Sequence, residues 1–170
     1  MQETAEAPVE TRDGRRDFDF LYGKWDMKNR RLENPVADDP GEWQEFESNL
    51  ETRPILGGLG NIDLYEAPDF PGRPGFHGFG LRLFDPTEKV WRIWWASTVS
   101  DGQIDTPVVG RFENGEGRFE TDDVLGGRAV RVRYEWKDIT PTSARWEQSF
   151  SFDGGRTYEP NWVVELTRTA

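Results

Sequence analysis

The 170-residue chain contains no cysteine and only one histidine, His77. The lack of cysteine excludes disulfides, thiolate nucleophiles and cysteine-based metal sites. With one histidine, further metal ligands would have to be carboxylates, and "FDGGRTYE" lacks the spaced acids of a calcium loop. The sequence also has no phosphate-binding glycine loop before a helix and no Gly-x-Ser-x-Gly motif. We therefore expect no metal, no cofactor and no serine hydrolase site.

Basic residues and long apolar runs are also scarce. The chain has 21 lysines and arginines against 32 acids, which gives a formal charge of −11 at pH 7. Because phosphate binding needs clustered cations, we expect no nucleic-acid partner. No apolar run approaches the roughly 20 residues that span a bilayer, and "MQETAEAPVETRDGRRD" has no hydrophobic signal core. We expect a soluble, cytoplasmic protein without membrane insertion, although removal of a signal peptide would leave the same pattern.

The chain is rich in aromatic residues, which make up 14% of it and include eight tryptophans. Residues 1–16 are charged and aperiodic, which predicts a flexible N-terminal arm, and residues 17–170 are expected to form one domain. Alternating segments between Gly, Pro, Asn and Asp turns are typical of strands. They predict strands at 24–32, 43–53, 60–66, 76–84, 90–97, 107–113, 117–124, 128–138, 143–152 and 162–168.

A meander of this length most simply closes on itself, because closure removes exposed sheet edges. We therefore predict an all-β fold, a single antiparallel meander β-barrel of about eight to ten strands. The two-residue period of a strand puts Val130, Val132 and Tyr134 on one face and Arg131 and Arg133 on the other. The apolar faces should point into the barrel, and the charged faces can pair across strands in solvent.

Two motifs carry a resemblance to a known superfamily. The first strand contains Gly23-Lys24-Trp25, and Arg168 lies near the end of the chain. This combination resembles the lipocalin and calycin signature, which implies that Trp25 plugs the closed end of the barrel and Arg168 packs across its ring. An arginine over an indole adds a cation–π contact of roughly 0.5–2 kcal/mol.

Longer stretches are similar to a widespread bacterial family of lipocalin-like domains of unknown function. They are "FDFLYGKWDMKNRRL", "RPILGGLGNID", "LRLFDPTEKVW", "PVVGRFENGEGRF" and "DITPTSARWEQSFSFDGGRTYEPNWVVELTR". The match runs from about Phe18 to Arg168 and implies the barrel fold, but the family supplies no agreed reaction. The segment "YEAPDFPGRPGFHGFG", which holds His77, matches no motif of that family.

His77 is the first candidate for chemistry, because a lone imidazole can act as a general base or acid. If it shares the core face it looks into the barrel, and if Phe76 and Phe84 define that face it looks out. Tyr65 and Asp63 on the preceding strand could complete a proton-transfer set with it. The alternatives are a structural or surface histidine and a solvated polar stripe.

A second candidate is a pair of charges on the first two strands. If Trp25 points inward, Arg31 does too, and a buried cation needs a partner or an anionic ligand. An inward Glu47 could pair with it as an internal salt bridge. In the alternative reading Glu47 is a base and Arg31 holds a carboxylate or enolate oxygen.

The remaining aromatic and amide side chains are candidates for a ligand-binding wall, or for an ordinary core. They are Trp25, Asn29, Asn49, Trp95, Tyr134, Trp146, Gln148 and Trp162. We predict that the cavity binds a small hydrophobic or aromatic molecule, with cofactor-free acid–base catalysis left open. The alternatives are a lyase, isomerase or hydrolase using His77, Tyr65, Asp63, Glu47 and Arg31, and a structural or interaction domain with a filled barrel. A homodimer is a further open possibility.

Overall fold

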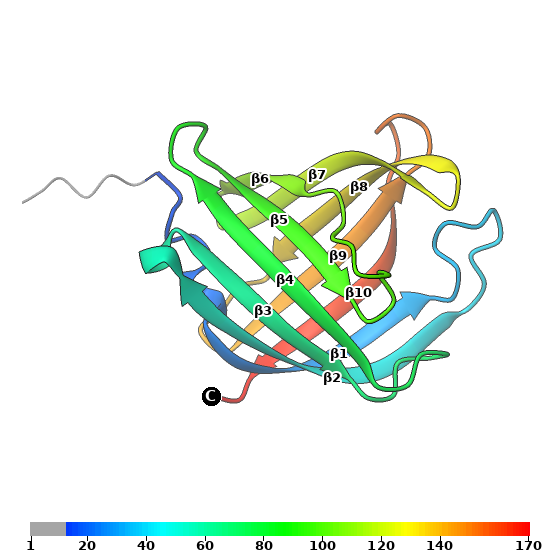
Figure 1. The fold of residues 1–170 in the computed structure, drawn as a ribbon, viewed down its shortest axis with the longest axis horizontal. Coiled ribbons are helices and arrows are strands. Elements are labelled where there is room, and N and C mark those ends of the chain that lie inside the picture. Colours follow the sequence, from blue (N-terminus) through cyan, green and yellow to red (C-terminus); the bar gives the residue numbers. More distant parts are fainter. Residues whose placement is uncertain (1–12) are drawn as a thin grey trace, which may run out of the picture.

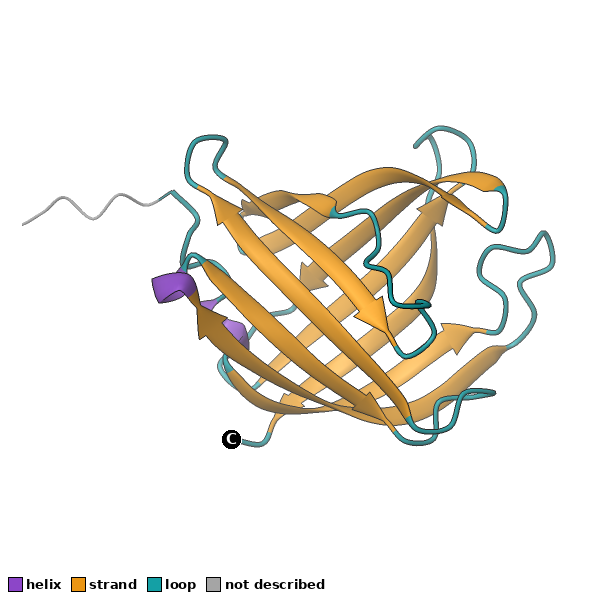
Figure 2. Ribbon diagram, in the orientation of Figure 1, coloured by secondary structure: helices purple, strands orange, loops and turns teal. Residues whose placement is uncertain are grey.

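The computed structural model describes residues 13–170, so residues 1–12 of the predicted N-terminal arm lie outside the described residues. Two short 3-10 helices, η1 (Asp19–Leu21) and η2 (Leu56–Gly58), lie at one end of the molecule (Figure 2). Among the described residues no helix is long and apolar enough to cross a membrane. The strands are β1 (Gly23–Leu32), β2 (Trp43–Ile55), β3 (Gly60–Ala67), β4 (Phe76–Asp85), β5 (Val90–Ser97), β6 (Val108–Glu113), β7 (Glu116–Leu125), β8 (Arg128–Lys137), β9 (Ser143–Ser151) and β10 (Glu159–Arg168).

The strands form a closed antiparallel barrel in which each strand pairs with its neighbours in sequence and β1 also pairs with β10 (Figure 1). The predicted all-β meander barrel is therefore confirmed. The largest boundary difference is at β10, which begins at Glu159 because its pairing with β9 continues across a register irregularity between Pro160 and Trp162.

Side chains alternate between the interior and the outer wall, as the period of two requires. On β1 the inward positions Trp25, Met27 and Asn29 are buried, and the residues between them are exposed. The charged outer positions of β7 to β10 pair across strands, as predicted: Arg133 Nε lies 2.6 Å from Glu120 Oε1 and Lys137 Nζ lies 3.0 Å from Glu147 Oε2. These ion pairs lie on the outer surface of the barrel, and the buried aromatic side chains lie inside it.

One end of the barrel is closed by the segment before β1. Phe18 and Leu21 are fully buried there, and the Phe18 ring lies 5.0 Å from Trp91 and 4.9 Å from Phe112, centroid to centroid. The Trp25 indole donates to the carbonyl of Leu21 at 2.9 Å. Aromatic rings meeting edge to face make this end a close-packed plug.

Arg168 locks the plug to the end of the chain. Its guanidinium lies 4.2 Å from the centroid of the Trp25 ring, which confirms the predicted stacking. The same guanidinium donates to the carbonyls of Phe20, Tyr22 and Pro141, so three chain segments meet at it.

Candidate functional site

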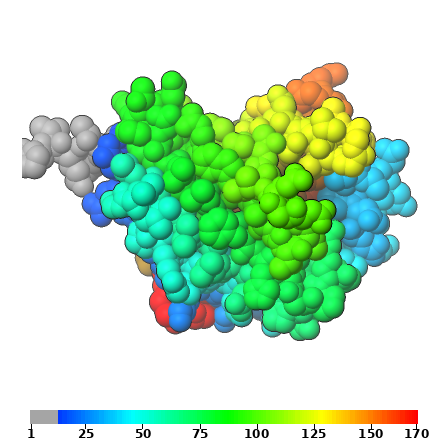
Figure 3. All heavy atoms as spheres, in the orientation of Figure 1, coloured from blue at the N-terminus to red at the C-terminus, as the bar shows by residue number. Residues whose placement is uncertain are grey.

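The interior opens into a cavity of about 720 Å³ at the end of the barrel opposite the plug. Its volume falls in the range of roughly 300–1,000 Å³ that is typical of small-molecule sites. The segment between β1 and β2 and the turn between β7 and β8 contribute to its mouth, and Figure 3 shows these light-blue and yellow segments meeting at the right of the molecule. Arg128 joins them, because its Nη1 donates to the carbonyl of Val36 at 2.9 Å.

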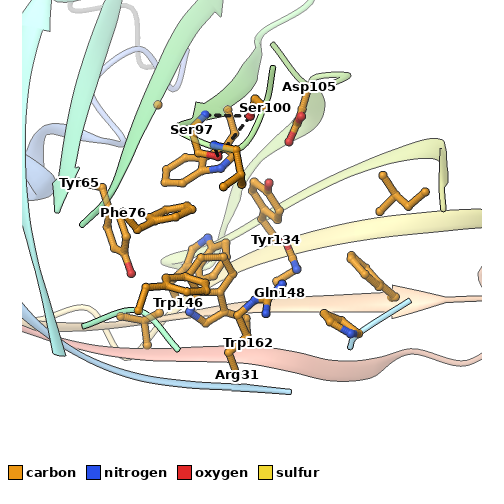
Figure 4. A pocket seen from close by; sticks show the side chains of 18 of the residues that line it. Arg31, Tyr65, Phe76, Ser97, Ser100, Asp105, Tyr134, Trp146, Gln148 and Trp162 are labelled. Carbon is orange, nitrogen blue, oxygen red and sulfur yellow. Dashed lines mark hydrogen bonds between the residues drawn. The ribbon is translucent and has the colours of Figure 1, made fainter. Parts of the chain in front are cut away.

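Nine of the thirty residues that line the cavity are aromatic, and several of them are seen in Figure 4. Tyr134 and Trp146 stand 5.1 Å apart, Trp146 and Trp162 5.6 Å apart, and Tyr65 and Trp95 5.7 Å apart, centroid to centroid. All five side chains point inward. Tyr65 is buried, with 4% of its surface exposed, and the other four are only partly buried. Inward rings that remain accessible must present that surface to the cavity.

Glycines on β4 make room for this wall. A Cβ atom at Gly78 would lie 2.1 Å from Trp95 Cη2, so only glycine lets the Trp95 indole lie against β4. At Gly80 a Cβ would lie 3.1 Å from Asp63 Oδ2. The glycines of "GFHGFG" that flank Phe79 therefore face the interior, whereas His77 points away from it.

A buried ion pair lies at the floor of the cavity. Arg82 Nη2 lies 2.5 Å from Asp63 Oδ2, and Arg82 Nη1 donates to Asp63 Oδ1 at 2.7 Å and to Asn61 Oδ1 at 2.9 Å. Thr52 also donates to Asp63 Oδ1, at 2.7 Å. Both carboxylate oxygens of Asp63 are thus occupied by donors, which makes the pair a satisfied structural element rather than a base poised for proton transfer.

Asn29 fixes two of the ring side chains from behind. Its Oδ1 accepts hydrogen bonds of 3.0 Å from both the Tyr65 hydroxyl and the Trp162 indole, and its Nδ2 donates to Ser48 Oγ at 2.7 Å. Burial raises the pKa of the Tyr65 phenol, so this hydroxyl stays neutral. The Tyr65 hydroxyl and the Trp162 indole N–H are therefore already hydrogen-bonded to Asn29. These two residues line the cavity with their rings.

Arg31 differs from Arg82 because it has no acidic partner among residues 13–170. Its guanidinium lies 5.4 Å from the centroids of both Phe70 and Trp162, and its only protein acceptor there is the Leu32 carbonyl, at 3.3 Å from Nη1. Its buried Nε has no partner. Burial, with a further contribution from the nearby Arg73 charge, lowers the pKa of Arg31 to about 10, so the group is still protonated at neutral pH.

The structure brings together eight of the residues selected from the sequence. The cavity is lined by Arg31, Asp63, Tyr65, Trp95, Tyr134, Trp146, Gln148 and Trp162. Asn29 supports the wall without lining it. Trp25 is 1% exposed within the plug, below the cavity.

Three selected residues lie on the outer wall instead. Glu47 and Asn49 are exposed, because Phe46, Ser48 and Leu50 take the inward positions of β2. Glu47 therefore makes no internal salt bridge with Arg31. His77 is also exposed, with its Nδ1 3.9 Å from Glu66 Oε1, so the imidazole is separated by the sheet from Tyr65 and Asp63. The expected proton-transfer set does not assemble.

Sequence reasoning missed Arg82, Phe70, Phe76 and Arg73. Arg82 lies on the same face of β4 as Gly78, Gly80 and Phe84. Assigning that face to the barrel interior would have identified Arg82 as a cavity residue. Phe70 and Arg73 lie between β3 and β4, where no strand periodicity indicates which way a side chain points. Within the described part of the chain, no group of three or more histidines and carboxylates is placed to hold a metal ion.

No protein-family model and no curated protein sequence matches the chain. Among solved structures, it is similar to the S-type phycobiliprotein lyase CPES from Guillardia theta, with 11% identity, a TM-score of 0.59, and coverage of 96% of this chain and 99% of that one. It is also similar to EF1p2_mFAP2b bound to DFHBI, with 13% identity, a TM-score of 0.47, and coverage of 92% and 99%. At these identities the likeness concerns the fold alone, and membership of the bacterial lipocalin-like family stays a prediction. What the chain shares with the lyase is the overall fold, which in this chain is a closed ten-stranded antiparallel barrel.

Proposed function

We propose that the protein binds a small, flat, aromatic or otherwise hydrophobic molecule at the open end of its barrel. The observation that carries this proposal is the cavity of about 720 Å³ with inward rings that stay accessible at Trp95, Tyr134, Trp146 and Trp162. A barrel whose interior is filled by side chains would have no such accessible rings. Transfer of apolar surface from water onto these rings supplies the driving force for binding.

The two groups expected to assist a proton transfer, Asp63 and Tyr65, are arranged for binding rather than for acid–base catalysis. Asp63 is held by Arg82 and Thr52, and the Tyr65 hydroxyl is committed to Asn29. A general base needs a free lone pair within hydrogen-bond reach of the substrate. The Tyr134 hydroxyl, which makes no hydrogen bond to another described residue, can orient a polar group of the ligand.

Two neighbouring tryptophans on β5 provide a matched test. Trp95 faces the cavity, whereas Trp94 faces the outer wall. Titration with 2-naphthalenemethanol, followed by tryptophan fluorescence and calorimetry, should give one saturable site in the unaltered protein. Trp95→Ala should weaken this binding by about fivefold or more, since it removes a stacking wall worth about 1 kcal/mol or more.

Trp94→Ala is the control, because it removes the same side chain from the opposite face and should leave the affinity unchanged. Equal losses in the two variants, or no saturable binding of uncharged bicyclic aromatics by the unaltered protein, would overturn the proposal.

A further inference from the structure

We infer that the ligand is a carboxylic acid, whose ring lies among the cavity tryptophans and whose carboxylate is held at the mouth by Arg31 and Arg73. This inference rests on the proposed function and names the chemical class of its ligand. Its starting point is the contrast between Arg31 and Arg82, two of the three arginines that line the cavity. Arg82 is neutralised by Asp63, and Arg31 has no carboxylate from residues 13–170 against it.

The surroundings of Arg31 hold its charge in place without neutralising it. The guanidinium lies beside both Phe70 and Trp162, 5.4 Å from each ring centroid, and the two rings are 6.0 Å apart, centroid to centroid. Cation–π contact with two rings favours the charged form but uses none of the N–H donors, which stay available to other acceptors. The cavity-facing edge of a planar guanidinium is a donor fork that matches the two oxygens of a carboxylate.

A second cation strengthens the local positive potential. Arg73 lies over the same Phe70 ring, 5.8 Å from its centroid, and it also lacks an ion-pair partner among the described residues. Glu33 also lines the mouth, but its carboxylate packs closely against Gly41. A Cβ atom added to Gly41 would lie only 2.8 Å from Glu33 Oε2. The Arg31 and Arg73 charges repel each other, and neither has an ion-pair partner among residues 13–170, so a bound anion would relieve the repulsion.

Two neutral donors on the Arg31 side of the cavity do not compete for this role. The Tyr65 hydroxyl and the Trp162 indole both donate to Asn29. Figure 4 shows Arg31 beside Trp162 on one side of the cavity and Asp105 on the opposite side. A carboxylate is therefore directed to the Arg31 side, and the aromatic body of the ligand to the rings of β5, β8, β9 and β10.

The test compares 2-naphthoate and indole-3-acetate with their methyl esters, which keep the ring and lose the charge. Isothermal titration calorimetry at pH 7 should show each acid binding about 10- to 100-fold more tightly than its ester. Arg31→Gln should bring this ratio close to one, while the affinity for the esters changes little. Arg31→Lys should keep part of the preference, because it retains the charge and loses the fork.

Two further variants keep the result interpretable. Arg73→Gln alters an exposed side chain, does not threaten folding, and should reduce the acid-to-ester ratio by a smaller factor than Arg31→Gln. Arg111→Gln, on the outer wall of β6, changes the net charge equally and should leave the ratio unaltered. Thermal melts establish that each variant is folded.

The outcomes separate this inference from the proposed function. Esters that bind as tightly as the acids, or an acid preference that survives in Arg31→Gln, overturn the carboxylate inference and leave cavity binding intact. Absence of binding for all four compounds and for 2-naphthalenemethanol overturns both.

Discussion

The two ends of the barrel are built from the same ten strands and the same kinds of residue, but they differ in what enters the interior. At the closed end the segment before β1 inserts Phe18 and Leu21 among the inward rings, and Trp25, Trp91 and Trp136 are 1–3% exposed. At the open end the connecting loops stay at the rim, and Trp95, Trp146 and Trp162 keep accessible surface. Aromatic content therefore does not distinguish a core from a binding wall, whereas the insertion of a plug does.

The charged groups of the two regions differ in the same way. The buried Nε of each arginine has no partner, but Arg82, above the plug, is paired with the Asp63 carboxylate, whereas Arg31, near the mouth, has two aromatic rings and the Leu32 carbonyl against it and no carboxylate from residues 13–170. Both guanidiniums are partly or wholly removed from water, which is costly without a partner. The neutralised pair serves the structure, and the cation without a carboxylate is the group that we propose for the ligand.

The largest effect is expected from removing the plug's central ring. Phe18→Ala should lower the free energy of unfolding by about 3–5 kcal/mol, because Phe18 is fully buried against Trp91, Phe112 and Phe119 and its loss leaves a cavity. Urea unfolding followed by far-ultraviolet circular dichroism measures the change. Val124→Ala, at a position that is 64% exposed, is the control and should stay within about 0.5 kcal/mol. A loss below about 1 kcal/mol for Phe18→Ala would show that the closed end is not a close-packed core.

A comparable loss should follow when the buried ion pair is broken on one side. Arg82→Met leaves the Asp63 carboxylate buried without its cation and should cost about 3–5 kcal/mol of folding free energy. The double variant Asp63→Leu, Arg82→Met removes both charges and should recover part of that loss. Arg31→Met should cost less than about 1 kcal/mol, because no carboxylate is left behind. Equal costs at Arg31 and Arg82 would contradict the difference drawn between the two sites.

A smaller effect is expected where the strand makes room for the wall. Gly78→Ala places a methyl group 2.1 Å from Trp95 Cη2, so the indole must move into the cavity. We expect a stability loss of about 1–3 kcal/mol and weaker binding of 2-naphthalenemethanol. Adding Trp95→Phe removes the clashing atoms and should restore stability. If the double variant is no more stable than Gly78→Ala, the contact is not the cause.

The architecture could be predicted from the sequence because strand periodicity and turn residues are local signals. Val130 to Trp136 alternate with charged residues, and the structure places them as that pattern requires. The stacking of Arg168 on Trp25 could be predicted only through the resemblance to the lipocalin signature, because the two residues lie far apart in the sequence and come side by side where β1 pairs with β10. Period two, however, defines two faces without saying which is the inner one.

That ambiguity decided where the site prediction went wrong. On β2 one face carries Phe46 and Leu50 and the other carries Glu47. The inward face is the apolar one, so the inward position expected for Glu47 was wrong. On β4 both faces carry apolar residues, so the inward position of Gly78, Gly80 and Arg82 follows only from packing against Trp95 and Asp63. These are tertiary contacts, and no signal within a single strand contains them.

The smallest effect is expected at His77, the residue that the sequence alone favoured. Its side chain is 61% exposed and its nearest acid, Glu66, is 60% exposed at 3.9 Å, so solvent screens any attraction between them. His77→Ala should change the free energy of unfolding by less than about 0.5 kcal/mol and leave the affinity for 2-naphthalenemethanol unaltered. The same titration on Trp95→Ala gives the contrast between an outer-wall and a cavity residue. A clear loss of ligand affinity in His77→Ala would mean that a ligand also contacts the outer wall of β4, where the strand presents Phe79 and Leu81 beside the imidazole.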